Sequence, residues 1–161
     1  AVEVANGEVS ASVIAEILGF GRQMLENPVE TLPHAKETLD ALAGRYRILL
    51  ITKGDLFDQE RKLAQSGLGD LFDAIEIVSE KNPATYARIF SQHGDGAAQS
   101  VMVGNSLKSD ILPVLEAGGW AVHIPHALTW AVEHAEIPAE APRFRHVEHM
   151  GQLTALLSTL G

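Results

Sequence analysis

Short apolar runs alternate with amphipathic stretches along most of the chain. Four runs stand out, at residues 47–52, 74–78, 100–104 and 120–125. They are short and rich in β-branched residues, and most have a glycine, a proline or a polar cluster close by. This pattern is typical of strands that are buried on both faces of a parallel sheet.

The stretches between and after these runs have helical periodicity. We expect helices at residues 33–42, 57–66, 83–92, 109–117 and 150–160. Gly44 and Gly67 follow the first two and favour helix ends, while Asn82 and Pro83 favour the start of the third. Alternating strands and helices imply right-handed crossovers, so the sequence predicts an α/β fold of the Rossmann-like, three-layer α/β/α type with a parallel sheet.

The first 30 residues differ from the rest. Residues 9–25 have a helical pattern with no strand before them, and Asn27 and Pro28 then interrupt the helix. We therefore predict two parts. Residues 1–30 are expected to be the remnant of a helical cap, and residues 31–161 the α/β core.

Composition narrows the possible functions. The chain has 161 residues, of which 46% are hydrophobic and 20% are charged, as in ordinary globular proteins. It has no cysteine, which excludes disulfides and thiolate sites. The net charge is −9 without a cluster of Lys and Arg, so we expect no nucleic-acid partner. No apolar run could span a bilayer and the first residues lack a signal-peptide pattern, so we expect a cytoplasmic protein without a membrane partner.

Polar residues follow three of the predicted strands, where ligands bind in open parallel sheets. These residues are Thr52, Lys53 and Gly54 after the first strand, Lys81 after the second, and Asn105 and Asp110 after the third. Each residue taken singly is more often a turn, capping or solvated residue. Their combination at successive strand ends favours phosphoryl chemistry instead. Thr52 and the backbone N–H groups of the turn after it would hold phosphate oxygens, Lys81 would neutralise charge, and Asp110 would hold a cation such as Mg²⁺.

Three of these segments resemble the conserved motifs of the HAD (haloacid dehalogenase-like) hydrolase superfamily. Ile51-Thr52-Lys53-Gly54-Asp55 is similar to its second motif, and Glu80-Lys81-Asn82-Pro83 to its third. Residues 103–111, Val-Gly-Asn-Ser-Leu-Lys-Ser-Asp-Ile, resemble its fourth. The resemblance covers residues 33–125, and the fourth motif is its most specific part.

The resemblance implies a Mg²⁺-dependent phosphatase that acts on a small phosphorylated metabolite. In that family an aspartate at the end of the first strand attacks the substrate phosphate and forms an aspartyl-phosphate. Lys81 and Thr52 match catalytic positions of the family. Thr52, Lys53, Gly54 and Lys81 would bind the phosphate, and Asp110 and Asn105 would hold the metal.

The sequence departs from the family because it contains no Asp-x-Asp, the motif that carries the nucleophile. Its aspartates are residues 40, 55, 58, 70, 73, 95 and 110, and no two are two positions apart. The resemblance therefore implies that the nucleophile lies in a segment absent from this sequence and that this chain alone is inactive. The missing strand would lie between residues 47–52 and 100–104, which leaves two unpaired strand edges.

A second departure is Asn105, which stands where the family usually has Asp. A neutral amide weakens Mg²⁺ binding unless Asp110 compensates. Dehalogenases of the same superfamily need no metal, so a dehalogenase-type displacement stays open, as does a catalytically inactive fragment or binding module. The pairs His123/His126 and His146/His149 have a spacing that could bind zinc, but neither lies on an expected helix, and we expect no metal site there.

Overall fold

The structure, a computed structural model, describes residues 9–26, 28–126, 133 and 135–160. It divides into two compact units, Ala1–Glu30 and Thr31–Gly161, and the division falls where the sequence pattern changes. The described part of the first unit contains the helix α1, Ala11–Glu26, which exposes Leu18 and Phe20. That this unit is the remnant of a cap stays a prediction.

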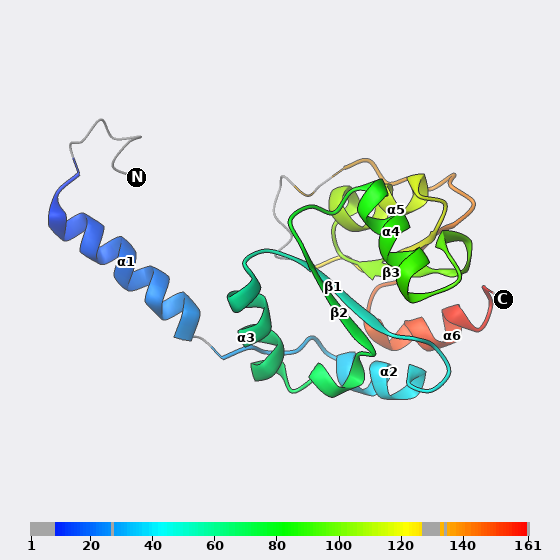
Figure 1. The fold of residues 1–161 in the computed structure, drawn as a ribbon, viewed down its shortest axis with the longest axis horizontal. Helices are drawn as coiled ribbons and strands as arrows, with labels where there is room; N and C mark the ends of the chain where they lie inside the picture. The colour runs from blue at the N-terminus through cyan, green and yellow to red at the C-terminus, as the bar shows by residue number, and fades with distance from the viewer. Residues whose placement is uncertain (1–8, 27, 127–132, 134, 161) are drawn as a thin grey trace. The chain divides into compact units, whose positions relative to one another are not determined.

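The second unit contains parallel strands with helices packed around them (Figure 1). Strand β1 (Leu49–Lys53) pairs in parallel with β2 (Ala74–Val78). A second parallel sheet has the order β3 (Val101–Gly104), β4 (Trp120–His123) and β5 (Phe144–His146). The α/β class and the first four strands agree with the sequence prediction, while β5 was not predicted.

The expected helices are present, with two differences at their starts. They are α2 (Ala35–Leu42), α3 (Leu56–Ser66), α4 (Pro83–His93), α5 (Leu112–Glu116) and α6 (Leu153–Leu157). The helix expected at residues 109–117 begins as a π-helical turn, η3 (Leu107–Ile111), that leads into α5. The C-terminal helix α6 is preceded by a 3₁₀ turn, η5 (Met150–Gln152).

Local side-chain chemistry explains where the central helices begin and end. The Asn82 side chain accepts a hydrogen bond from the Thr85 amide at 2.9 Å, which caps α4 in front of Pro83. Asp55 caps α3 in the same way through the Asp58 amide at 3.1 Å. Gly67 ends α3 in the left-handed conformation, with φ +67°.

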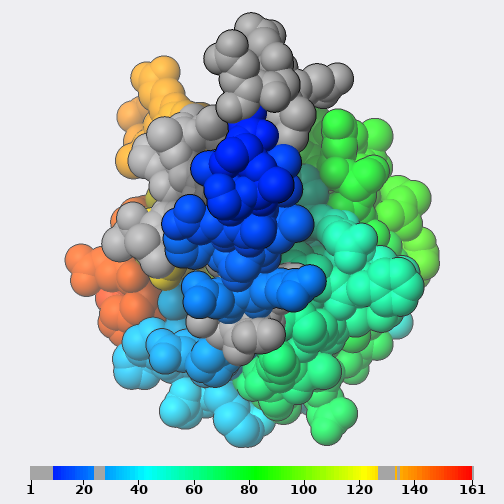
Figure 2. All heavy atoms as spheres, turned by 90° about the vertical axis from the view of Figure 1, so that its left-hand side faces the viewer, coloured from blue at the N-terminus to red at the C-terminus, as the bar shows by residue number. Residues whose placement is uncertain are grey.

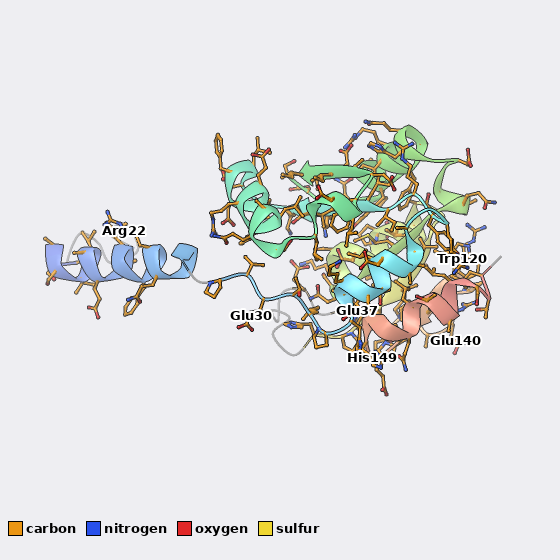
Figure 3. All side chains as sticks on the ribbon, turned by 90° about the horizontal axis from the view of Figure 1, so that it is seen from below. Arg22, Glu30, Glu37, Trp120, Glu140 and His149 are labelled. Atoms are coloured by element: carbon orange, nitrogen blue, oxygen red, sulfur yellow. The ribbon has the colours of Figure 1, made fainter. Side chains whose placement is uncertain are left out.

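The helices differ in how deeply they are buried. Helix α4 contributes the fully buried Tyr86 and Ile89 to the largest core cluster. Helix α2, which carries Glu37, lies beside the segment that carries His149 (Figure 3), and the Thr38 hydroxyl donates to the Met150 carbonyl there at 3.2 Å. Helix α3 has no buried residue, so its side chains form part of the surface (Figure 2). Within the described residues, no helix is both long and apolar enough to cross a membrane.

The two sheets do not join in the described part of the chain. Strand β1 is hydrogen-bonded to β2 and β3 to β4, but β1 and β3 are not neighbours in a sheet. Both strands instead line one cavity of about 630 Å³. That a strand between residues 47–52 and 100–104 is missing stays a prediction from the sequence.

Candidate functional site

A buried ion pair joins two of the residues that the sequence singled out. Lys81 lies between β2 and α4, and its Nζ is 2.7 Å from Oδ1 of Asp110 in η3. Their side chains are only 13% and 6% exposed. The Ser106 amide donates to the other carboxylate oxygen of Asp110 at 3.0 Å. Both oxygens of this buried carboxylate are therefore satisfied, one of them by a full positive charge.

The backbone at the end of β3 allows Asp110 to reach this position. A Cβ at Gly104 would lie 2.5 Å from the Cβ and Cγ of Asp110, so only glycine leaves room for the carboxylate. Ser106 caps the π-helical turn by accepting a hydrogen bond from the Ser109 amide at 2.9 Å. π-helical turns of this kind are often found at functional sites.

Tyr86 forms a hydrogen bond to the backbone of the same turn. Its hydroxyl donates to the Ser109 carbonyl at 2.9 Å, and its side chain is fully buried. Burial, followed by the negative charge of Asp110, raises the pKa of Tyr86 well above its usual range. The phenol is therefore protonated at neutral pH, where its hydroxyl donates to the Ser109 carbonyl.

Thr52, Lys53 and Gly54 lie at the end of β1, as expected. The Thr52 hydroxyl donates to Gln59 Oε1 at 2.8 Å, so its described hydrogen bond goes to α3 and not to Lys81 or Asp110. Gly54 has φ +149° and lies against the Gln59 side chain, which explains the need for glycine at this turn. The register pairs Lys53 with Val78, three residues before Lys81, so both strands end at the same edge.

Glu133 belongs to the site but was not predicted. Its carboxylate accepts hydrogen bonds from the hydroxyls of Ser106 and Ser109 and lies 3.6 Å from the Lys53 ammonium. The hydrogen bonds from Ser106 and Ser109 are the main reason why the pKa of Glu133 is lowered. Glu133 thus places a negative charge between the end of β1 and the turn after β3.

No sequence signal distinguishes Glu133 from other acids, because its partners lie 24 and 27 residues away along the chain. Apart from Glu133, residues 127–134 lie outside the described part of the structure.

Asn105 connects the site to a pair of histidines. Its carbonyl is 3.1 Å from Nε2 of the buried His123, and His123 Nδ1 is 3.2 Å from His146 Nδ1. Burial of the imidazole ring is the main reason why the pKa of His123 is lowered. Across the described residues, no three His, Cys, Asp or Glu side chains form a group that could hold a metal ion.

The depressed pKa of His123 makes stability depend on pH. Because the folded protein favours the neutral ring, the stabilisation is complete above the unfolded-state pKa of about 6.5 and is lost as the pH falls from there toward the lower folded-state pKa. We therefore expect the free energy of unfolding, measured with urea, to fall between pH 7.5 and pH 5.5. The fall should be smaller in a His123→Gln variant, and equal falls in both proteins would contradict this assignment.

The residues expected to hold Mg²⁺ fit as part of a ligand set. Asp110 supplies a carboxylate and Asn105 follows β3 in the same loop. Mg²⁺ is usually held by one or two carboxylates together with waters and substrate phosphate oxygens. Asp110 and Asn105 offer oxygen donors of the kind that Mg²⁺ prefers, and that they hold this metal stays a prediction.

A family model for haloacid dehalogenase-like hydrolases matches residues 5–118. The chain belongs to this family. The match begins earlier than the resemblance found in the sequence, which started at residue 33. It therefore includes residues 5–30 of the first unit. The α/β core agrees with the fold expected for a HAD-like hydrolase.

Among its relatives, this HAD-like hydrolase is similar to two phosphatases. It is 29% identical to an N-acylneuraminate-9-phosphatase from Mus musculus over 132 residues, which cover 78% of this chain and 51% of the relative. It is 33% identical to a pyrimidine 5'-nucleotidase from Escherichia coli over 93 residues, 54% of this chain and 41% of the relative. The chain thus spans about half the length of these relatives.

A solved structure covers nearly all of the chain. A haloacid dehalogenase-like hydrolase from Xanthomonas campestris superposes with a TM-score of 0.86 at 42% identity, over 99% of this chain and 67% of that one. An L-2-haloacid dehalogenase from Xanthobacter autotrophicus superposes with a TM-score of 0.71 at 20% identity, over 99% of this chain and 72% of that one. The latter likeness concerns the fold alone.

Proposed function

We propose that this HAD-like hydrolase is a Mg²⁺-dependent phosphatase that acts on a small phosphorylated metabolite through an aspartyl-phosphate. The buried pair of Lys81 and Asp110 at the carboxyl ends of the strands carries the proposal. It places a cation and an acid at one point of the sheet edge, where phosphoryl transfer needs charge neutralisation. The similarity to two phosphatases supports the same chemistry.

In this proposal Lys81 neutralises charge on the substrate phosphate and on the attacking carboxylate. Its ammonium is mostly shielded from water, so its charge acts more strongly than it would at the surface. Asp110 keeps Lys81 in place and, with Asn105, would hold Mg²⁺, which supplies further stabilisation of negative charge on phosphate oxygens. The nucleophile itself is proposed to come from a segment outside these 161 residues.

Thr52, Lys53 and Gly54 are proposed to bind the phosphate oxygens at the end of β1. In the structure the hydroxyl of Thr52 is engaged by Gln59 and the ammonium of Lys53 faces Glu133. A phosphate that reaches Lys53 would therefore compete with the Glu133 carboxylate. Phosphate binding should therefore require the ion pair between Lys53 and Glu133 to break.

One observation favours a second reaction class. Asn105 offers a neutral amide where the family usually has an acid, which suits a displacement that needs no metal. A dehalogenase, however, has no phosphate to hold, and the acid Asp110 favours a reaction that uses a metal. We therefore rank dehalogenation second.

The two reactions are separated by one pair of assays. The natural protein, expressed with the residues that flank these 161, is incubated with p-nitrophenyl phosphate and with 2-chloropropionate, each with Mg²⁺ or with EDTA. We expect hydrolysis of the phosphate ester that EDTA abolishes, and no chloride release. The 161-residue chain should be inactive, because it contains no Asp-x-Asp. Chloride release without phosphate release would overturn the proposal.

A further inference from the structure

The carboxylate of Glu133 is bound by donors from two separate parts of the core unit. The hydroxyls of Ser106 and Ser109, in the turn that follows β3, both donate to its Oε2. The ammonium of Lys53, at the end of β1, lies 3.6 Å from its Oε1. A cation and hydroxyl groups directed at one anion form strong, charge-assisted contacts. We call Lys53, Ser106 and Ser109 the donor cluster.

The two serines of the donor cluster are held in place by bonds that do not involve Glu133. The Ser106 hydroxyl oxygen accepts a hydrogen bond from the Ser109 amide at 2.9 Å, so its own proton is available to donate to an anion. The Ser109 carbonyl accepts from the buried Tyr86 hydroxyl at 2.9 Å. The serine hydroxyls are therefore preorganised, and they would still point at an anion that replaced the carboxylate.

Each of the two lysines at this edge of the sheet lies against a carboxylate, and the two ion pairs differ in burial. Lys81 and Asp110 are nearly buried, and Asp110 also accepts from a backbone amide. Lys53 and Glu133 are 45% and 25% exposed. Breaking a buried ion pair costs far more than breaking a partly exposed one. An anion that binds a lysine here should therefore displace Glu133 and leave Asp110 in place.

Phosphate matches the donor cluster better than the Glu133 carboxylate does. One carboxylate oxygen, Oε2, accepts from both serines. The phosphoryl group of a monoester has three free oxygens, so each member of the cluster could donate to an oxygen of its own. At neutral pH that group also carries more negative charge than a carboxylate. Exchange of Glu133 for phosphate is therefore favoured by both geometry and charge.

We infer that Lys53, Ser106 and Ser109 form a phosphate-binding site that the Glu133 carboxylate occupies in the free protein, and that phosphate binds there by displacing Glu133. The two serines thereby join the residues proposed to bind phosphate, and Glu133 acts as an internal competitor that lowers the affinity of the site. The identity of the ligand rests on the proposed function. Binding needs no turnover, however, so the 161-residue chain itself can be tested.

The first variant is Glu133→Gln, which keeps the size of the side chain and removes its charge; Glu133→Ala replaces it if it does not fold by circular dichroism. Affinity for inorganic phosphate is measured at pH 7.5 by isothermal titration calorimetry. We expect Glu133→Gln to bind phosphate about ten-fold more tightly than the unchanged chain, because no charged competitor has to be displaced. The matched control is Glu136→Gln, which removes the same charge from an exposed side chain of the same segment and should leave the affinity unchanged.

Two further substitutions, made in the Glu133→Gln variant, locate the bound phosphate. Lys53→Met removes the cation of the donor cluster and Ser109→Ala removes one hydroxyl, and each should abolish most of the gain in affinity. Lys62→Met is the control for the first. Lys62 is exposed to a similar degree, 48%, but it pairs with Asp58 in α3 and should not contribute.

Several outcomes would overturn the inference. Equal affinities of the unchanged and Glu133→Gln chains, or no binding by either, would show that Glu133 does not compete with phosphate. Weaker binding by the variant would show that Glu133 helps to build the site. A gain that survives Lys53→Met would place the phosphate elsewhere.

The same measurements separate this inference from the proposed function. A gain in phosphate affinity in a protein that fails to hydrolyse p-nitrophenyl phosphate would reject the proposed function alone. Hydrolysis of that ester by the natural protein, without a gain in affinity in Glu133→Gln, would reject this inference alone.

Discussion

Replacing Lys81 by alanine is expected to destabilise the core unit by about 3–5 kcal/mol, because it leaves a buried charge without its partner. The Asp110 side chain is 6% exposed and its Oδ1 has Lys81 Nζ at 2.7 Å. Without that ammonium, the charged carboxylate is left in a poorly solvated place. The free energy of unfolding, measured with urea at pH 7.5, provides the test.

A second lysine variant serves as a matched control. It distinguishes the loss of a buried ion pair from the loss of a lysine at the surface. Lys36 forms a similar ion pair with Asp40 at 2.9 Å, but these side chains are 61% and 49% exposed. Lys36→Ala should therefore leave the unfolding midpoint almost unchanged. Adding Asp110→Asn to Lys81→Ala should recover part of the lost stability, because it removes the unpaired charge. Equal losses for Lys81→Ala and Lys36→Ala would contradict the buried ion pair.

The same substitution tests the role of Lys81 in catalysis. In a form of the protein that hydrolyses p-nitrophenyl phosphate, Lys81→Ala should lower kcat by a factor of about 10²–10³, as the loss of one well-placed charge-stabilising group does in other enzymes. Assays at a temperature where the variant is fully folded exclude a loss caused by unfolding. Normal turnover would remove Lys81 from the proposed site.

The sequence predicted the strands and helices best where tertiary contacts reinforce local pattern. The apolar run at 74–78 coincides with β2, and Asn82 and Pro83 start α4 where expected. Strand β5 was missed because it has three residues, of which only Phe144 is buried. A single apolar position between polar neighbours gives no detectable alternation.

The candidate site was predicted in part, because a general rule for parallel sheets placed its residues. Strand ends meet at one edge, so Lys81 and Asp110 could be expected to lie close together although they are 29 residues apart. The π-helical turn and the Gly104 contact depend on exact backbone positions that periodicity does not encode. Glu133 depends on the path of a loop, for which the sequence has no periodic signal.

Replacing Gly104 by alanine is the second substitution with a large expected effect. The new Cβ would lie 2.5 Å from the Cβ and Cγ of Asp110, and such a contact cannot be relieved by rotating the end of a flexible side chain. The π-helical turn must shift, which we expect to cost about 3 kcal/mol in the free energy of unfolding. Gly69→Ala is the control, because its Cβ would meet nothing closer than Leu63 Cγ at 3.9 Å.

A combined variant shows whether Gly104 acts through the ion pair. If Gly104→Ala displaces Asp110, it already separates the carboxylate from Lys81, and adding Lys81→Ala should then cost less than the sum of the two single losses. Residues that act through a shared partner are expected to be non-additive in this way. Urea unfolding of the two single variants and the double variant measures the difference. Strict additivity would mean that the glycine supports the end of β3 independently of Asp110, and that the close approach between them does not position the carboxylate.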